Sequence, residues 1–188
     1  MARPGEALID PIRGQRLVFR RTAKETRGAL LEVEAFYQPT SIAPPAHLHP
    51  NQEEHFEILA GSMTICVNDE EHTYHVGEIC DIPAGVAHSM WNGSEAEAHL
   101  LWQTRPALHT EDFFEVMWGL AQAGKTDKAG VPNLLQLAVI LRQYRQEFRP
   151  IGPPLMVQNI VFVFLAALGR LCGYRPTWTF KGGERKRE

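Results

Sequence analysis

The chain has only three cysteines among its 188 residues: Cys66, Cys80 and Cys172. They are too few and too widely separated to form the disulfide framework of a small secreted domain. No C-x-x-C pair occurs, which excludes a zinc ribbon and a thioredoxin-like redox pair. The first ten residues also lack the basic and then apolar pattern of a secretory signal peptide. We therefore expect a protein of the reducing cytoplasm.

Positive charge is nearly absent from the middle of the chain. Residues 31–124 contain fifteen acidic residues and one basic residue, Arg105, whereas residues 125–188 contain eleven basic and four acidic residues. Two parts with different surfaces are therefore expected. The basic part carries no patch of aromatic and basic residues, and the connection from Gly124 to Pro132 is too long for a helix-turn-helix. We therefore expect no nucleic-acid binding.

Long apolar runs are also scarce. The most apolar segment, residues 155–172, is interrupted by Gln158, Asn159 and Arg170, and its unbroken run is only residues 160–168. A membrane span needs about 20 predominantly apolar residues. A helix buried against the barrel or in a dimer interface is therefore favoured, and membrane contact through residues 155–172 stays as the alternative.

Short β-strands are predicted over the first part of the chain, where β-branched and aromatic residues alternate with polar ones. The predicted strands are residues 15–20, 29–38, 55–60, 63–67, 72–76, 79–82, 87–91 and 98–104. Residues 1–14 are punctuated by proline and glycine, which predicts a loose arm or an edge strand. About eight short strands at near-regular spacing indicate an antiparallel barrel or sandwich.

Beyond Pro106 the spacing of apolar residues becomes helical. Three helices are predicted: residues 110–123, a second that begins after the cap Asn133 and includes Tyr144 and Phe148, and residues 155–172. Thr110 is the predicted cap of the first helix, and Gly124 its end. The predicted domains are thus a mainly β domain at residues 1–106 and a helical extension at residues 107–188.

Four residues stand out as candidate metal ligands. His47 and His49 are two positions apart, which places both imidazoles on one face of a strand. Glu54 shares the parity of the inward residues Phe56 and Ile58, and His88 follows a Pro-x-Gly turn that can bend its strand towards the first pair. Three neutral imidazoles and one carboxylate can hold a divalent transition metal and leave positions free for water or substrate.

The spacing around these residues resembles that of the cupin superfamily. The first cupin motif is matched by His47-x-His49, Glu54 and Gly61, and the second by Gly77, Pro83-x-Gly85, His88 and Asn92. One departure is Ser41, which stands where the motif usually begins with glycine. The resemblance covers about residues 29–105, with a short stretch between the motifs as in the small single-domain cupins of bacteria.

The resemblance implies a mainly β fold, a double-stranded β-helix of the jelly-roll type, followed here by about three C-terminal helices. It also implies that His47, His49, Glu54 and His88 hold one metal ion, which in this family is iron, manganese, nickel, copper, cobalt or zinc. The residue types alone select none of these ions. Because cupins commonly form dimers, a homodimer is expected.

The side chains expected to line the cavity are apolar and aromatic: Phe36, Phe56, Ile58, Met90 and Trp102. Such a wall suits a hydrophobic small molecule better than a sugar phosphate. Similar cupins include dioxygenases, isomerases, decarboxylases and cyclases, and we favour metal-dependent oxygenase chemistry. The alternative is a non-catalytic binding or sensor protein whose helices contact a partner or a membrane. A third reading makes the extension a lid over the barrel mouth or a dimer arm.

Overall fold

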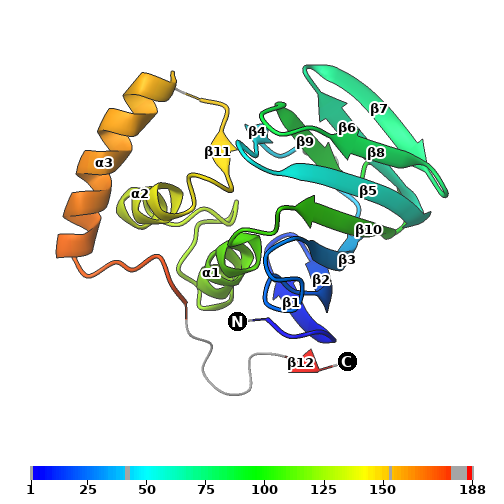
Figure 1. Cartoon of the computed structure of the whole chain (residues 1–188), viewed down its shortest axis with the longest axis horizontal. Helices are drawn as coiled ribbons and strands as arrows, with labels where there is room; N and C mark the ends of the chain where they lie inside the picture. Colours follow the sequence, from blue (N-terminus) through cyan, green and yellow to red (C-terminus); the bar gives the residue numbers. More distant parts are fainter. Residues whose placement is uncertain (1, 41–42, 153, 179–185, 188) are drawn as a thin grey trace.

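Two facing antiparallel β-sheets form the main body of the computed structural model, which describes residues 2–40, 43–152, 154–178 and 186–187. The larger sheet has the strand order β12-β1-β2-β3-β10-β5-β8, and the smaller sheet has the order β11-β4-β9-β6-β7. Strands that are distant in the sequence are therefore neighbours in both sheets. The predicted mainly β fold with a double-stranded barrel and later helices is confirmed (Figure 1).

The strands of the larger sheet are β1 (Glu6–Asp10), β2 (Gln15–Arg21), β3 (Leu31–Tyr37), β5 (Glu53–Ala60), β8 (Ile79–Ile82), β10 (Ala98–Arg105) and β12 (Lys186–Arg187). Those of the smaller sheet are β4 (His47–Leu48), β6 (Ser62–Val67), β7 (Glu70–His75), β9 (His88–Trp91) and β11 (Arg149–Pro150). The sequence pattern located β2, β3 and the strands from β5 to β10, and the spacing of His47 and His49 indicated a strand at β4. β1 lies in residues 1–14, which were predicted as a loose arm or an edge strand. The two-residue strands β11 and β12 were not predicted, because their pairing depends on distant residues. Ser41 lies outside the described residues.

A hairpin joins β6 and β7, where Val67 pairs with Glu70. Asn68 and Asp69 form its turn with φ values of 50° and 68°. Asparagine and aspartate tolerate this left-handed conformation, which matches the right-handed twist of the two strands.

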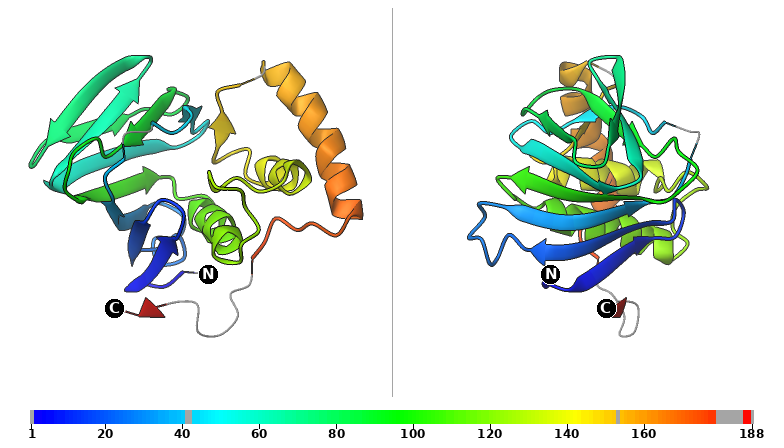
Figure 2. Two further views of the ribbon diagram at one scale, coloured as in Figure 1. Left: turned by 180° about the vertical axis from the view of Figure 1, so that it is seen from behind. Right: turned by 90° about the vertical axis from the view of Figure 1, so that its right-hand side faces the viewer.

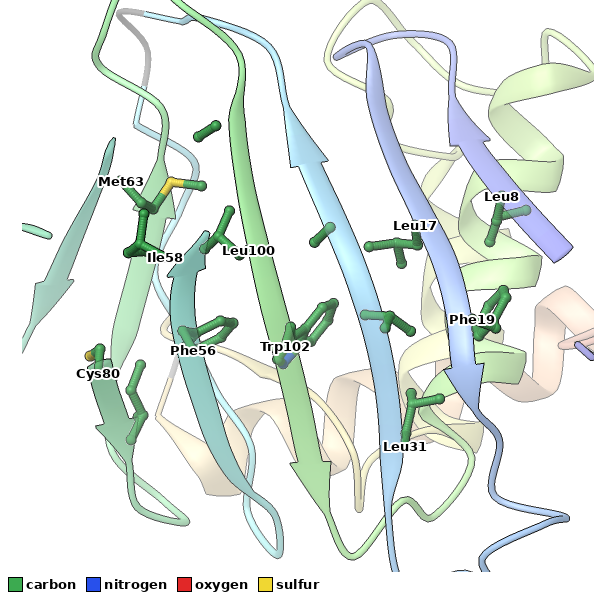
Figure 3. Close-up of a cluster of buried hydrophobic side chains, with 14 of the residues drawn as sticks. Leu8, Leu17, Phe19, Leu31, Phe56, Ile58, Met63, Cys80, Leu100 and Trp102 are labelled. Atoms are coloured by element: carbon green, nitrogen blue, oxygen red, sulfur yellow. The ribbon is translucent and has the colours of Figure 1, made fainter. Parts of the chain in front are cut away.

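The core lies between the sheets and is made of the inward side chains, which alternate with outward ones along each strand. Val33 and Ala35 of β3, Phe56 and Ile58 of β5, and Trp102 of β10 belong to this cluster. Figure 3 shows the Phe56 and Trp102 rings side by side on adjacent strands, and their centroids are 5.8 Å apart. The barrel interior is therefore packed by side chains along much of its length.

Three helices follow the barrel: α1 (Thr110–Gln122), α2 (Leu134–Gln143) and α3 (Leu155–Leu171). The Asn133 cap is confirmed, because its side chain accepts a hydrogen bond from the Gln136 amide. Thr110 is not the cap of α1. His109 holds that position, and the Thr110 hydroxyl accepts a hydrogen bond from Gln52 instead.

The second helix ends earlier than the sequence pattern predicts. Tyr144 is its C-terminal cap, and Phe148 lies in the segment that leads into β11. Phe148 is at helical spacing from the apolar residues of α2 but is not part of that helix. Its ring packs towards the barrel instead. β11 pairs with β4, so the extension adds a strand to the smaller sheet.

The helices lie together on one side of the barrel, with α1 next to the larger sheet and α3 outermost (Figures 1 and 2). α3 packs on α2 and is not buried against the barrel. Among the described residues, no helix is both long enough and apolar enough to cross a membrane.

Candidate metal centre

Two short strands bring three histidines together. His47 in β4 pairs directly with His88 in β9. Residues opposite each other in an antiparallel ladder project from the same face, and the two ring centroids are 4.5 Å apart. His49 follows β4, and its carbonyl oxygen accepts a hydrogen bond from the amide of Gly85. This bond fastens the Pro-x-Gly loop that precedes His88 to the first histidine pair.

Glu54 projects from β5 in the opposite sheet towards these rings. Its Oε2 lies 3.0 Å from His88 Nε2, and its Oε1 lies 3.3 Å from His49 Nε2. Trp102 on the neighbouring strand β10 donates an indole N–H to the same Oε1 at 3.1 Å. The carboxylate is only 3% exposed, so these groups replace water as its partners.

The other ring nitrogen of each histidine faces a backbone carbonyl. His49 Nδ1 is 2.5 Å from the oxygen of Glu147, and His88 Nδ1 is 3.1 Å from the oxygen of Val86. The His47 ring bonds to the backbone of Pro45, whose only polar group is its carbonyl. A carbonyl oxygen can only accept, so each ring must donate from this side. Metal-binding histidines are oriented in the same way in proteins.

This orientation has a consequence for the Nε2 atoms of His49 and His88. In a neutral ring that donates from Nδ1, Nε2 carries a lone pair. That lone pair would face a carboxylate oxygen of Glu54 at 3.0–3.3 Å. Two acceptors at this distance repel each other unless a positive charge lies between them. The geometry therefore requires either a proton on Nε2 or a metal ion.

The pKa values agree with a site that holds one positive charge. Burial, and then the neighbouring His49 and His88, lower the pKa of His47 to about 3. Burial alone would lower the pKa of His88, but the Glu54 carboxylate outweighs it and the pKa is raised. Burial alone would raise the pKa of Glu54, but the three imidazoles lower it. Without metal, these shifts favour an ion pair of protonated His88 with Glu54 between pH 4.5 and 6.5, beside a neutral His47.

The residues present fit a transition-metal ion. One ligand atom from each of His47, His49 and His88 lies within 4.8 Å of the others. Glu54 adds a carboxylate at contact distance from two of them. The structure thus brings all four sequence-predicted ligands together. Imidazole and carboxylate donors suit several divalent ions and do not select one.

Two residues of the extension complete the surroundings of the histidines, and the sequence pattern did not locate them. The Phe148 ring stacks on His47 with centroids 4.8 Å apart. The Glu147 carbonyl accepts from His49, while its side-chain Oε1 accepts from the amide of His109. The extension therefore covers the histidine side of the barrel. Both residues are about a hundred positions from His47 in the sequence, and no local signal identifies such a contact.

Tyr37 is a further inward residue near the carboxylate. It shares the parity of Leu31, Val33 and Ala35 on β3, so strand alternation alone could have placed it inside. Burial, and then the negative charge of Glu54, raise its pKa well above the ordinary value, which keeps the phenol protonated. Asn92 holds the end of this strand by donating to the Tyr37 carbonyl at 2.8 Å. Asn92 is thus a structural residue of the motif.

The predicted pocket residues divide into three groups. Phe36 lies on the outer face of β3, where it stacks on His99 with centroids 4.2 Å apart, so its assignment to the pocket is wrong. It shares the parity of the polar residues Glu32 and Glu34, which already indicated an outward position. Phe56 and Ile58 point inwards but are only 1% exposed, and Trp102 contacts Glu54. Met90 is half-buried against the core.

A small pocket of about 150 Å³ adjoins Glu54. Its lining is mostly charged and includes Glu53, His55, Asp81 and Arg105. His55 and Asp81 form a pair at 2.7 Å on adjacent strands. Because His55 has the opposite strand parity from Glu54, it does not join the metal ligands.

Comparison with known proteins supports the assignment made from the motifs. Residues 33–104 match the family model of the cupin domain. A protein of Arthrobotrys oligospora named as an oxidoreductase is 44% identical over 50 residues, and this match covers 26% of the present chain and 19% of that protein. The match thus spans about a fifth of the length of that relative.

Similar solved structures include a predicted oxalate decarboxylase from Thermotoga maritima, with 18% identity and a TM-score of 0.46, covering 49% of this chain and 80% of that one. The cupin domain of Schizosaccharomyces pombe Cnp3 has 13% identity and a TM-score of 0.44, covering 49% of this chain and 64% of that one. The family match spans both motifs and the strands that carry the four candidate ligands. The match to the cupin domain is thus confined to the barrel, residues 33–104.

Proposed function

We propose that the barrel binds one divalent transition-metal ion through His47, His49, Glu54 and His88, and that the protein is a metal-dependent enzyme with oxygenase-type activity on a small hydrophobic molecule. The observation that carries the metal proposal is the orientation of the histidines. His49 and His88 donate from Nδ1 to carbonyl oxygens while their Nε2 atoms face one buried carboxylate. A protein gains little by building this arrangement unless a cation occupies it.

Such an ion, when bound, supplies Lewis acidity or a redox centre with positions free for O₂ and substrate. The residues of the chain then position and protect the reacting molecule. Trp102 fixes the Glu54 carboxylate, and Phe148 covers the His47 ring and keeps water from that side. Tyr37 keeps its proton and can donate a hydrogen bond inside the barrel. The half-buried Met90 adds apolar surface.

The proposed activity is supported by the apolar interior and by the relative whose name is that of an oxidoreductase. The test is O₂ consumption by protein loaded with Fe(II), Mn(II) or Ni(II), across a panel of aromatic diols and β-diketones. Activity in the wild type that is lost in His88→Ala and kept in His99→Ala supports the proposal. If none of the loaded proteins consumes O₂ above the metal-free control, oxygenase chemistry on these substrates is refuted.

A non-catalytic metal-dependent binding protein is the second candidate. It is favoured by the complete burial of Phe56 and Ile58, which leaves little open volume between the sheets, and by the Phe148 ring over His47. The two functions differ in one measurement. A binding protein holds its metal and changes its metal-centred absorption when the small molecule is added, but it consumes no O₂ and releases the molecule unchanged.

A further inference from the structure

The outermost helix of the molecule exposes its apolar side. α3 packs on α2 through a narrow stripe in which only Ala166 and Gly169 are buried. A Cβ at Gly169 would lie 2.8 Å from the carbonyl oxygen of Leu135, so glycine lets the two helices approach closely. The stripe is also held at its end, where Gln136 donates to the carbonyl of Arg175. The orientation of α3 on the protein is therefore fixed.

α3 carries nine large apolar side chains that are 42–86% exposed. Eight of them lie on the side away from the stripe, and one, Leu155, lines the groove beside the start of the helix. The nine are Leu155, Met156, Val157, Ile160, Val161, Val163, Phe164, Leu168 and Leu171. At roughly 100 Å² each they form a surface on the order of 900 Å², against about 300–600 Å² for the largest apolar patch on a typical monomer. Many recur at helical spacing on one face, whereas Gln158, Asn159 and Arg170 lie towards or beside the packed stripe. Figures 1 and 2 show no other element outside α3.

Positive charge surrounds this face at both ends. Arg142, Arg145 and Arg149 line a groove beside the start of α3, and no carboxylate contributes to that lining. Arg170 and Arg175 lie at the other end of the helix. The only acidic residue between positions 134 and 178 is Glu147, which is 3% exposed. Among the described residues, none of these arginines forms an ion pair with a carboxylate.

The positions of these arginines decide whether the exposed face of α3 suits a second copy of the chain or an anionic lipid surface. If a second copy packed α3 against α3, an antiparallel arrangement would bring the arginines of one end against those of the other. A parallel arrangement would bring identical ends together. Both place arginine against arginine without a carboxylate, which opposes association. An anionic lipid surface offers apolar acyl chains to the helix face and negative head groups to the arginines at both ends.

We propose that the protein binds the surface of anionic membranes with the exposed face of α3 lying in the plane of the interface. One side of the helix stays on α2, so only the opposite face enters the lipid. Binding places the metal centre on the protein side of the helices, with the barrel away from the lipid. This proposal rests on α3 and its arginines alone and does not depend on the chemistry of the metal site.

The test is co-sedimentation of the full chain with phosphatidylcholine vesicles that contain none or about 30% phosphatidylglycerol, at low and high salt. We expect binding to the anionic vesicles that weakens as salt rises. Phe164→Ser with Leu171→Ser should lower the partition coefficient at least about tenfold, because it removes two of the most exposed apolar side chains. Val76→Ser is the matched control, since Val76 is 63% exposed on the barrel and should leave binding unchanged.

A second pair of variants tests the charge. Arg145→Gln with Arg170→Gln should weaken binding by about fivefold per arginine, as expected for cations close to an anionic surface. Lys24→Gln with Arg27→Gln removes the same charge from an exposed loop of the barrel and should have little effect. Equal binding to neutral and anionic vesicles would overturn the role of the arginines. No vesicle binding would overturn the proposal, and self-association that Phe164→Ser abolishes would assign the face to a second copy.

Discussion

Replacing His88 with glutamine in the metal-free protein should cost more stability than replacing His88 and Glu54 together. The single change leaves the Glu54 carboxylate 3% exposed and without the imidazolium that lies 3.0 Å from it. Removing one partner of a buried ion pair typically costs about 3–5 kcal/mol. Because Trp102 still donates to Glu54 and His49 remains 3.3 Å away, we expect about 3 kcal/mol.

The stability lost in His88→Gln should depend on pH. The directions of the pKa shifts of Glu54 and His88 decide how it depends. The pKa of Glu54 is lowered from 4.5 and that of His88 is raised from 6.5. The pair therefore contributes its full stabilisation between these two ordinary values. The contribution is lost as pH falls through the folded-state pKa of Glu54, and again as pH rises through the folded-state pKa of His88. The difference in the free energy of unfolding between wild type and His88→Gln should thus be largest near pH 5.5 and should become smaller at lower and at higher pH.

Urea unfolding followed by circular dichroism, in the presence of a chelator and at several pH values, measures this difference. The double variant Glu54→Gln with His88→Gln removes both charges and should be more stable than the single variant at pH 5.5. If the single variant is as stable as the wild type, or if its loss does not vary with pH, then His88 and Glu54 are not a buried ion pair and the reasoning fails.

Three further predictions concern neighbouring groups. Metal binding near pH 6 should release about one proton per ion, because the ion displaces the proton shared by His88 and Glu54. Calorimetric titration in two buffers of different ionisation enthalpy measures the number of protons released, and a value of zero would contradict this exchange. Trp102→Phe keeps an aromatic ring but removes the N–H that holds Glu54, so it should weaken metal binding about tenfold in competition with a chelating dye; unchanged affinity would show that this bond does not orient the ligand. Asn92→Ala removes a buried amide that donates to the carbonyls of Tyr37 and Ala96 and should lower the free energy of unfolding by about 1–2 kcal/mol in urea titration; a loss no larger than that of the neighbouring Ser94→Ala would be inconsistent with this role.

The sequence was informative wherever a local rule decides the structure. Strand alternation predicted that Glu54 lies on the inward face, as the structure has it, and the same rule turns His55 outwards. The same rule places Tyr37 inside and Phe36 outside, and the aromatic character of Phe36 does not change the side to which its position in β3 turns it. The Asn133 cap followed from the preference of asparagine for that position.

Contacts between distant parts of the chain could not be predicted from such local rules. Phe148 lies at helical spacing from Leu141 and Tyr144, yet the helix ends at Gln143 and the ring packs on His47. Threonine is a favourable helix cap, but the Thr110 hydroxyl accepts a hydrogen bond from Gln52, more than fifty residues earlier in the chain. In both cases a tertiary partner decides the outcome, and local propensity carries no information about it.

The metal centre itself is tested by elemental analysis of the wild type and of His88→Ala, both purified without a metal-chelating tag. We expect about one transition-metal ion per chain in the wild type and almost none in His88→Ala. His99→Ala, which changes a histidine on the outer face, should keep the metal of the wild type. Absence of metal from the wild type even after incubation with Fe(II), Mn(II), Ni(II) and Zn(II), or equal metal in His88→Ala, would contradict a metal centre formed by these residues.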